Sequence, residues 1–574
     1  MPGIKTAFAI GCLGSLCLGQ DAQLLPPLHP TEGFRAAHSA GVTLPFSQTL
    51  PLPKGQLFPQ QVPQTLTLDG RPLPAQAKIA AYWSDGSIQW LALSGVWPQD
   101  LPLPQNPVLQ PGPAPAAPHP EASFSLQQQD GGLQLHYQGR LFAKLQLEAG
   151  VVPISKPKAR DSRAPEDYDT RVQYAWAEPV DQLSQPGQEI PLQPVIREFL
   201  LEHEDADSLL YRIRGNGGQD SPGADLEWQL RLRIFRHTPV IRFQTTWFLH
   251  WSPEKFALSK ARLTATFPQE WQQGRNQAQS YPLNGQPVQL VSDCSGRNHI
   301  TQNNQKAEAE WPAPERHAWT LSNASAALGI AVPNFTRLGP NRLSLDSARL
   351  QLDSWDGESG LALDTRRTVE RDEFMMDTYD FDYDASGLAK TSEMTWCLTS
   401  SEPTAAAAAG AEAGRQWLWF PSRADLVASK AMGNWKEEAF ANNTAYIEGL
   451  AGQMHWLMAS RDHWRWNGFV NYGDVRTNWS RGGWDRDGAR ILHPMRWGMN
   501  GRYGWRNGSG EPYAGFLTFG LWAEDREIIL FAYDNATHVA DVDVMHGRFN
   551  QPLQKVQGGM HRRNKNHWSG AVQT

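Results

Sequence analysis

Apolar and polar residues alternate with a period of two in three short runs between residues 41 and 97. Such alternation is typical of strands that turn one face to a core and the other to solvent. One Asp-Gly pair, at residues 69–70, lies within the second run, and another, at residues 85–86, lies between the second and third runs. This dipeptide favours the tight turn of a β-hairpin. The pattern therefore predicts a small unit of short antiparallel strands.

A second and larger β region extends from residue 121 to residue 402. Its clearest runs, LRLRIF at 230–235 and VIRFQTTWFLHW at 240–251, alternate strictly and flank a His-Thr-Pro break, which predicts a hairpin. The density of such runs, without helical periodicity, predicts a large antiparallel β-sandwich. Residues 98–120 lie between the two β regions and are rich in proline, which predicts an extended linker.

The pattern becomes helical after Pro403. An alanine-rich stretch begins there with Thr404, a residue type suited to the N-cap of a helix. Long connections rich in tryptophan and glycine join the expected helices, and long connections in compact domains often carry function. Residues 403–574 are therefore expected to form an all-α unit. Its helices are expected at residues 404–419, 422–432 and 436–464, with two more over 512–545.

The chain begins with MPGIKTAFAIGCLGSLCLGQ, which combines Lys5, an apolar run and small residues near Gly19. These features predict a secretory signal peptide over residues 1–19, and hence a secreted or periplasmic protein. No later run approaches 18 uninterrupted apolar residues, so no membrane span is expected. Beyond the signal peptide only Cys294 and Cys397 remain, and the sequence leaves open whether they pair.

Charge and composition narrow the functional classes. The formal net charge of −7 argues against binding of nucleic acid through the field of the whole protein, so an anion site would have to be local. The chain has 24 tryptophans, and an indole ring packs well against the apolar face of a sugar. For the whole set of tryptophans, a carbohydrate-binding cleft and core packing explain the excess about equally well, and for any single tryptophan core packing is the better explanation.

Polar and aromatic residues that can do chemistry gather in four blocks of the C-terminal region. The blocks are rich in Tyr, His, Arg and Asn, and the last of them lies in a stretch, residues 544–574, that contains no Asp or Glu. They are GFVNYGDVRTNW with Asn471, Tyr472, Asp474 and Arg476; GRYGWRNGSGEP with Arg502, Tyr503, Trp505, Asn507 and Glu511; ATHVADVDVMH with His538, Asp541, Asp543 and His546; and GGMHRRNKNHWSG with His561, Arg562, His567 and Trp568.

Several chemistries are open to these blocks. Asp543 and His546 stand three residues apart on an expected helix, where they would share a face as metal ligands. No recognised zinc spacing accompanies them, so no metal cofactor is expected, and a divalent cation such as Ca²⁺ is the alternative. The basic residues of the fourth block fit a solvated tail better than a nucleic-acid site. A glycoside hydrolase would pair Asp474 or Glu511 with Asp541.

β-Elimination on a uronic acid uses the residue types that all four blocks supply. A cation or an amide neutralises the uronate carboxylate, a base removes the adjacent proton, and an acid protonates the departing oxygen. The acid–base candidates are Tyr472, Tyr503, His546, His561 and His567. Arg476, Arg502, Arg562 and Asn507 would bind the carboxylate, and Trp505 and Trp568 would stack on sugar rings.

The stretch VTLPFSQTLPLPKGQL, followed by LDGRPLPAQAKIAAYWSDGSIQWL, resembles the N-terminal RIFT-barrel domain of exo-rhamnogalacturonan lyase and YetA-like proteins. SWDGESGLALDTRRT and SGLAKTSEMTW are similar to the end of that family's central β-sandwich, and the four blocks resemble parts of its C-terminal α/α toroid. The resemblance implies a small RIFT-type β-barrel over residues 38–97, a β-sandwich over 121–402 and a partial toroid over 403–574. The family has further helices after HWSG, so the chain is expected to end within the toroid.

The resemblance also implies an activity and a partner. It predicts a polysaccharide lyase that degrades a uronate-containing polymer of the rhamnogalacturonan or pectin type by β-elimination from one end. The expected partner is an anionic polysaccharide, with no nucleic acid and no cofactor. The alternatives are a glycoside hydrolase that uses a carboxylate pair, and a non-catalytic carbohydrate-binding protein related to the lyases.

Overall fold

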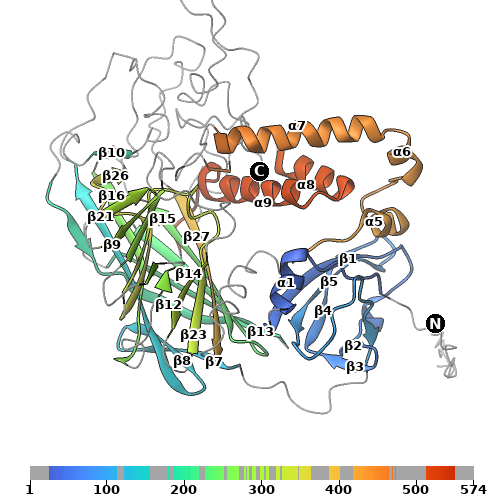
Figure 1. The fold of residues 1–574 in the computed structure, drawn as a ribbon, viewed down its shortest axis with the longest axis horizontal. Helices are drawn as coiled ribbons and strands as arrows, with labels where there is room; N and C mark the ends of the chain where they lie inside the picture. The colour runs from blue at the N-terminus through green and yellow to red at the C-terminus, as the bar shows by residue number, and fades with distance from the viewer. Residues whose placement is uncertain are drawn as a thin grey trace, which may run out of the picture.

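The computed structural model describes residues 25–549 with interruptions, and most of the described chain is β-structure with helices towards the C-terminal end (Figure 1). The residues outside the description are 1–24, 40, 113–121, 155–176, 180–186, 206, 219–225, 251–254, 270–276, 279–280, 283–287, 293–297, 303–304, 309–317, 323–325, 347, 364–386, 401–417, 464–467, 469–471, 474–511 and 550–574.

Two small sheets around one core form the N-terminal unit. Its elements are α1 (Glu32–Ser39), β1 (Leu44–Pro51), η1 (Pro59–Gln61), β2 (Leu66–Leu68), β3 (Arg71–Leu73), β4 (Ala75–Tyr82), β5 (Ile88–Trp97) and β6 (Gln110–Pro111), joined by β28 (Leu418–Trp419). The strand orders are β28-β1-β5-β4 and β3-β2-β6. The expected hairpins form, and between β2 and β3 the φ angles of Asp69 and Gly70 are 49° and 75°, as a tight hairpin turn requires.

The proline-rich stretch does not leave the N-terminal unit at residue 98. Leu101 and Leu109 are buried in the core of this unit, and β6 pairs with β2. Residues 98–112 of the stretch expected as a linker therefore pack against the unit. Residues 113–121, the rest of the predicted linker, lie outside the described residues.

Two large sheets follow. The 12-stranded sheet runs in the order β21-β20-β19-β24-β25-β16-β9-β8-β7, with β10, β11 and β26 attached at its side, and the nine-stranded sheet runs β12-β13-β14-β15-β27-β23-β22-β17-β18. The first contains β7 (Phe124–Gln129), β8 (Gly132–Tyr137), β9 (Arg140–Pro153), β10 (Ala177–Pro179), β11 (Ile190–Leu192), β16 (Phe256–Thr266), β19 (Val288–Ser292), β20 (Asn298–Gln302), β21 (Gln305–Glu308), β24 (Asn341–Leu345), β25 (Arg349–Trp355) and β26 (Leu361–Leu363). The second contains β12 (Val195–Glu204), β13 (Ser208–Asn216), β14 (Leu226–Phe235), β15 (Val240–Leu249), β17 (Gln277–Ala278), β18 (Tyr281–Pro282), β22 (Ala318–Ser322), β23 (Ala326–Ala331) and β27 (Leu388–Ser400).

One hydrophobic core lies between the two sheets. Strand β14 shows how the sequence pattern builds it, because Leu230, Leu232 and Ile234 are fully buried while Arg231 and Arg233 point to the opposite face. The predicted hairpin of β14 and β15 forms in register. Several tryptophans serve this core rather than a cleft. Trp228, Trp247, Trp355 and Trp396 are at most 1% exposed.

Helices make up most of the described C-terminal part. They are α5 (Arg423–Ser429), α6 (Glu437–Ala441), α7 (Thr444–His463), α8 (Pro512–Ala523) and α9 (Arg526–His538), and α9 continues into a π-helical turn, η6 (Val539–Asp543). Figure 1 shows α7 above α8 and α9, with all three helices above the N-terminal unit in this view. No helix in the described part of the chain is both long enough and apolar enough to cross a membrane.

The helix expected over residues 404–419 does not include its last two residues. Leu418 and Trp419 form β28, which pairs in parallel with Ser47 and Gln48 of β1. Trp419 is 2% exposed and packs among aromatic rings of the N-terminal core. Burial of this indole against a distant strand therefore outweighs the local helix propensity. Residues 404–417 lie outside the described residues.

Candidate functional site

A small cavity lies where α9, the turn at Tyr472 and β27 come together. Its volume is about 40 Å³, which leaves room for about three water molecules. A sugar ring does not fit inside, so a polysaccharide would reach these residues from outside the cavity. The lining consists of Pro333, Asn334, Leu338, Lys390, Thr391, Glu393, Tyr472, Tyr533, Asp534, Thr537, His538, Asp541 and Val542.

Asp534 of α9 is the polar centre of the cavity wall. The Tyr472 hydroxyl donates a hydrogen bond to Asp534 Oδ2 at 2.6 Å, and the Asn334 amide donates to Oδ1 at 3.0 Å. Arg461 of α7 places Nη1 3.7 Å from Asp534 Oδ2. All four side chains are at most 5% exposed. The carboxylate is therefore held between a phenol, an amide and a guanidinium, which fixes the orientation of the tyrosine.

The turn that carries Tyr472 is fastened to α9 by its backbone. Asn535 Nδ2 donates to the carbonyl of Gly473 at 2.7 Å, and His538 Nδ1 lies 3.1 Å from the carbonyl of Tyr472. A carbonyl oxygen only accepts, so in this contact Nδ1 of His538 carries the proton and Nε2 is the basic ring nitrogen. His538 thus presents a potential base in the same cavity as the Tyr472 hydroxyl.

Asp541 attaches the end of α9 to the exposed edge of β27. Its Oδ2 accepts from the Thr391 backbone N–H at 2.7 Å, and its Oδ1 accepts from the Thr391 hydroxyl at 2.8 Å. Strand β23 ends opposite Thr395, so Thr391 lies beyond the paired part of this edge. The carboxylate therefore satisfies a backbone donor that the sheet leaves unpaired. Burial raises the pKa of Asp541 to about 6, against the lowering effect of the Thr391 hydrogen bonds.

Charged and phenolic groups of β27 and α9 complete the opening. The Tyr533 hydroxyl donates to Glu393 Oε1 at 3.1 Å, and Arg242 of β15 reaches Glu393 Oε2 at 3.7 Å. Lys390 is buried, and its ammonium donates to the Leu338 carbonyl at 3.1 Å. The cavity thus combines carboxylates, phenols, one imidazole and one ammonium, which is a set of groups suited to proton transfer.

The structure brings together residues from two of the four predicted blocks. Tyr472 of the first block meets His538 and Asp541 of the third block in this cavity. Asp534 and Asn334 were not predicted as site residues. The other predicted site residues of these blocks lie outside the described residues, and their roles stay predictions. They are Asn471, Asp474, Arg476, Arg502, Tyr503, Trp505, Asn507, Glu511, His561, Arg562, His567 and Trp568.

His546 does not share a helix face with Asp543. The helical turn ends at Asp543, and the chain continues as an extended segment in which the His546 N–H donates to the Gly387 carbonyl next to β27. The imidazole packs edge-on against Phe248, and its Nε2 lies 2.6 Å from the Ala540 carbonyl. Burial lowers the pKa of His546. In this structure His546 therefore helps to attach the end of the helix to the sheet and does not line the cavity.

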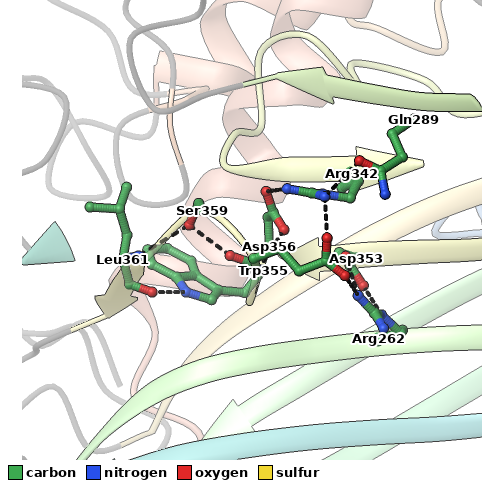
Figure 2. Close-up of polar contacts among 9 residues, drawn as sticks. Arg262, Gln289, Arg342, Asp353, Trp355, Asp356, Ser359 and Leu361 are labelled. Carbon is green, nitrogen blue, oxygen red and sulfur yellow. Dashed lines mark hydrogen bonds and ion pairs between the residues drawn. The ribbon is translucent and has the colours of Figure 1, made fainter. Parts of the chain in front are cut away.

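The SWDGESG motif forms a second polar cluster, on the outer face of the 12-stranded sheet (Figure 2). Arg262 contacts Asp353 through two parallel hydrogen bonds, and Arg342 donates to Asp356 Oδ2 at 3.0 Å. Asp356 also accepts from the Glu358 N–H at 2.9 Å and so closes the turn. The carboxylates of this cluster are already engaged by the two arginines, which indicates that the motif shapes a turn and holds three strands together.

The described residues show neither a cluster of metal ligands nor a disulfide. Among the residues that the structure describes, no group of three or more His, Cys, Asp or Glu side chains lies together as metal ligands would. Cys397 is a buried free thiol, and burial raises its pKa to about 12. It packs in the contact between β27 and the N-terminal unit. Cys294, its only possible partner beyond the signal peptide, lies outside the described residues.

The N-terminal unit can be assigned by comparison with known protein families. Residues 33–102 match the PcRGLX-like N-terminal RIFT barrel domain. This part of the chain is therefore a RIFT barrel domain of the kind found in rhamnogalacturonan lyase-like proteins, as the two N-terminal motifs predicted. The match covers β1 to β5 and does not reach the cavity.

Comparison of whole chains gives weaker likenesses. No curated protein matches the sequence. A glycosyl hydrolase family 38 protein from Enterococcus faecalis has 12% identity and a TM-score of 0.32, over 66% of this chain and 45% of its own. An α-mannosidase from Enterococcus faecalis V583 has 11% identity and a TM-score of 0.32, over 66% and 44%. The Slr1438 protein from Synechocystis sp. PCC 6803 has 8% identity and a TM-score of 0.23, over 50% and 99%. The chain thus spans less than half of the length of the first two.

Proposed function

We propose that this protein is a polysaccharide lyase that cleaves a uronate-containing polysaccharide of the rhamnogalacturonan or pectin type by β-elimination, acting from a chain end. The two large sheets would be the β-sandwich of such a lyase, and α6 to α9 would be part of its α/α toroid. One observation carries the proposal. The Tyr472 hydroxyl, 2.6 Å from Asp534, lies in one cavity with the imidazole of His538.

The proposed roles follow from the hydrogen bonds. Tyr472 donates its proton in the structure and is therefore protonated, so it is suited to protonate the departing glycosidic oxygen. His538, with Nδ1 protonated towards the Tyr472 carbonyl, offers Nε2 to take the proton next to the uronate carboxylate. Lys390 is a cation at the same cavity that can offset the charge on that carboxylate. In the elimination the C–H and glycosidic C–O bonds break and a C=C bond forms.

Sequence supports the same proposal independently of the cavity. The RIFT barrel domain at residues 33–102 is of the kind found in rhamnogalacturonan lyase-like proteins. The Tyr-, His- and Arg-rich blocks after residue 470 hold further groups that elimination can use. Tyr503, His561 and His567 stay acid–base candidates, with Arg476, Arg502 and Arg562 as candidates for carboxylate binding.

The test is an assay of product chemistry with one tyrosine variant. The protein is incubated with rhamnogalacturonan and with polygalacturonate, and the ultraviolet absorbance of the unsaturated product is followed. We expect turnover by the parent protein and a loss of about 10²- to 10⁴-fold in kcat for Tyr472→Phe, because the variant keeps the ring and removes the proton donor. Tyr446→Phe is the matched control, since Tyr446 is 65% exposed on α7. Equal activity of Tyr472→Phe and the parent protein would remove Tyr472 from the mechanism.

A glycoside hydrolase is the second candidate, and one observation favours it. Asp534 and Asp541 line the same cavity, and burial raises the pKa of Asp541 to about 6, as suits a general acid. Both oxygens of Asp541 already accept from Thr391, which makes the elimination the better supported candidate. New reducing ends without ultraviolet absorbance would establish hydrolysis. Retention on the polymer with neither product would establish a carbohydrate-binding protein.

A further inference from the structure

Five arginines lie together on the outer face of the nine-stranded sheet. They are Arg212 and Arg214 of β13, Arg231 and Arg233 of β14, and Arg242 of β15, and all are partly exposed. The strand register places Arg212 opposite Arg231, and Arg233 opposite Arg242. Like charges directly opposite each other on a sheet are destabilising. The arrangement therefore costs stability unless an anion compensates for it.

Acidic residues on the sheet compensate for only part of this charge. Glu202 contacts Arg212 at 2.8 Å and Arg231 at 3.3 Å, Glu198 also contacts Arg212, and Glu393 contacts Arg242 at 3.7 Å. Among the residues that the structure describes, these three carboxylates pair with Arg212, Arg231 and Arg242, and none of them forms an ion pair with Arg214 or Arg233. Arg214 instead donates to the neutral Gln229 Oε1 at 2.9 Å, and Arg233 donates to the Ser208 hydroxyl at 3.3 Å.

The pKa shifts of Arg214 and Arg233 agree with this excess of positive charge. Burial lowers the pKa of Arg214, the neighbouring Arg212 and Arg231 lower it further, and Glu198 and Glu202 oppose them. Burial lowers the pKa of Arg233 too, Arg242 and Arg231 add to the lowering, and Asp205 opposes it. Asp207 opposes the effect on Arg233, but burial raises the pKa of Asp207, and its carboxylate accepts a hydrogen bond from Gln76 of the barrel.

Other parts of the chain bound this arginine face on three sides. At one end Phe235 and Val240 pack into the core of the N-terminal barrel. At the other end Phe549 lies 4.5 Å from the Arg214 guanidinium, and its N–H donates to Glu227. Towards β27 the face reaches Glu393, which also lines the cavity of Tyr472. Figure 1 shows the barrel beside the large sheets and the helices above the barrel. Among the described residues, the face is thus a partly exposed strip that leads to the cavity of Tyr472.

We propose that the arginine face of β13, β14 and β15 binds an extended anionic polysaccharide and leads it to the cavity at Tyr472. A guanidinium group presents two parallel N–H donors that match the two oxygens of a carboxylate, so uronate residues along a chain are suitable ligands. The continuity of the face with the cavity through Glu393 favours a polysaccharide over a nucleic acid. This inference deepens the proposed function and rests on it for the identity of the polymer.

The experiment compares two double variants with the same change of charge. Arg214→Gln/Arg233→Gln removes the two guanidinium groups that donate to neutral acceptors. Arg71→Gln/Arg349→Gln removes two arginines on the barrel and on β25, each with a side chain 54% exposed. Binding is measured by isothermal titration calorimetry with polygalacturonate, with fully methyl-esterified polygalacturonate, with dextran sulfate and with single-stranded DNA. Thermal unfolding of each variant checks its fold.

We expect polygalacturonate to bind the parent protein and the control variant equally, and the Arg214/Arg233 variant about tenfold or more weakly, because two charge-assisted contacts are lost. The methyl ester should not bind, since its carboxyl groups are esterified and carry no charge. Tighter binding of dextran sulfate than of polygalacturonate would reassign the face to sulfated polymers and overturn a uronate ligand. Arginine-dependent binding of DNA at equal strength would overturn a polysaccharide ligand.

A further variant covers the case in which the glutamine substitutions disturb the fold. Arg214→Lys/Arg233→Lys keeps both charges and loses the planar fork, so we expect it to fold and to bind with an affinity between those of the parent protein and the glutamine variant. Tyr472→Phe should bind polygalacturonate as the parent protein does. Arginine-dependent binding without any unsaturated product would contradict the proposed lyase activity and still support the proposed binding face. Equal binding of polygalacturonate by all arginine variants, whether or not product forms, would overturn the proposal that this face binds the polymer.

Discussion

Asp541 attaches a helix end to a sheet, and its buried carboxyl group makes the free energy of unfolding depend on pH. It closes the unpaired edge of β27 by accepting two hydrogen bonds from Thr391, and this contact fixes the end of α9 next to the cavity. Burial raises its pKa from 3.8 to about 6. The folded protein therefore binds more protons than the unfolded chain between about pH 4 and pH 6, and the free energy of unfolding falls as the pH rises through this window.

The substitution Asp541→Asn tests this linkage. An asparagine can accept from the Thr391 N–H and donate to the Thr391 hydroxyl, so the attachment of η6 is kept while the titration is removed. We expect the variant to be as stable as the parent protein near pH 4 and more stable at pH 7, by about 3 kcal/mol at most. Chemical denaturation at a series of pH values measures the difference, and subtracting the two curves removes the other titrating groups.

Asp541→Ala provides the contrast to the asparagine variant. It removes both acceptor oxygens, so the Thr391 N–H is left without a hydrogen bond. We therefore expect Asp541→Ala to be less stable than Asp541→Asn at pH 4 as well as at pH 7. A difference between Asp541→Asn and the parent protein that does not change with pH would contradict the assignment of a raised pKa to this residue.

At the level of residues, the sequence predicts which reactive side chains are present better than it predicts which of them come together in the fold. Tyr472, His538 and Asp541 stood in the predicted blocks because Tyr, His and Asp occur there in short aromatic-rich stretches. Asp534 and Asn334 were not predicted as site residues, although Asp534 accepts the hydrogen bond of the Tyr472 hydroxyl. The two are 200 residues apart in sequence and meet only because α9 packs against the end of β23 and β27. Local pattern contains no information on such a pairing.

The turn at Tyr472 depends on close contact between backbones. Gly473 has a φ of +91°, and a Cβ atom there would lie 2.4 Å from the Asp534 carbonyl and 2.7 Å from His538 Cβ. Only glycine allows both the left-handed backbone and this distance. The element therefore positions the tyrosine through a residue that has no side chain.

Gly473→Ala should separate the turn from α9. The added methyl group forces the Tyr472 carbonyl and hydroxyl away from His538 and Asp534, so we expect a loss of more than about 2 kcal/mol in the free energy of unfolding. The proposed lyase activity should fall together with it, since the tyrosine is misplaced. Urea denaturation and the product assay measure the two effects.

Gly433→Ala is the matched control for this substitution. Gly433 has a φ of +96° and no heavy atom within 4 Å of the position of a Cβ atom, so the control carries the backbone strain without the clash. It should cost only about 1 kcal/mol and leave activity unchanged. If both glycine variants lose the same stability, backbone strain alone explains the effect and the close contact with α9 is unimportant.

At the level of elements, local patterns predicted what local forces determine. The Asp-Gly turns, the β14–β15 hairpin and the helices from α5 to α9 follow from alternation, capping and turn residues within a few positions of one another. Strand β28 did not follow from such patterns, because Leu418 and Trp419 pair with a strand more than 300 residues earlier. The order of strands in the two large sheets is non-local in the same way, as the pairing of β15 with β27 shows.

Contacts between distant parts of the chain join the barrel to the helical part. Trp419 stacks on Phe46 at 4.8 Å and meets Phe34 edge-on at 4.7 Å, so a residue of the C-terminal part fills the core of the N-terminal barrel. Nearby, His29 Nε2 lies 2.8 Å from Asp425, which forms a capping box with the N-cap residue Ser422 of α5. Strand β28 and the His29–Asp425 contact therefore connect the barrel to α5, and we expect the two to unfold together.

Trp419→Ala tests this coupling at the scale of the whole molecule. Removal of a buried indole costs about 3–5 kcal/mol through lost burial and the cavity that remains. Because β28 leads directly to the N-cap of α5, we expect amides of β1 and of α5 to lose protection from hydrogen exchange to a similar extent. Trp456→Ala is the control, since Trp456 is 54% exposed on α7 and should leave both elements protected. Loss of protection in β1 alone would mean that the barrel opens independently of the helical part, and the RIFT barrel would then be a separate unit that does not help to hold α5 and the helices after it in place.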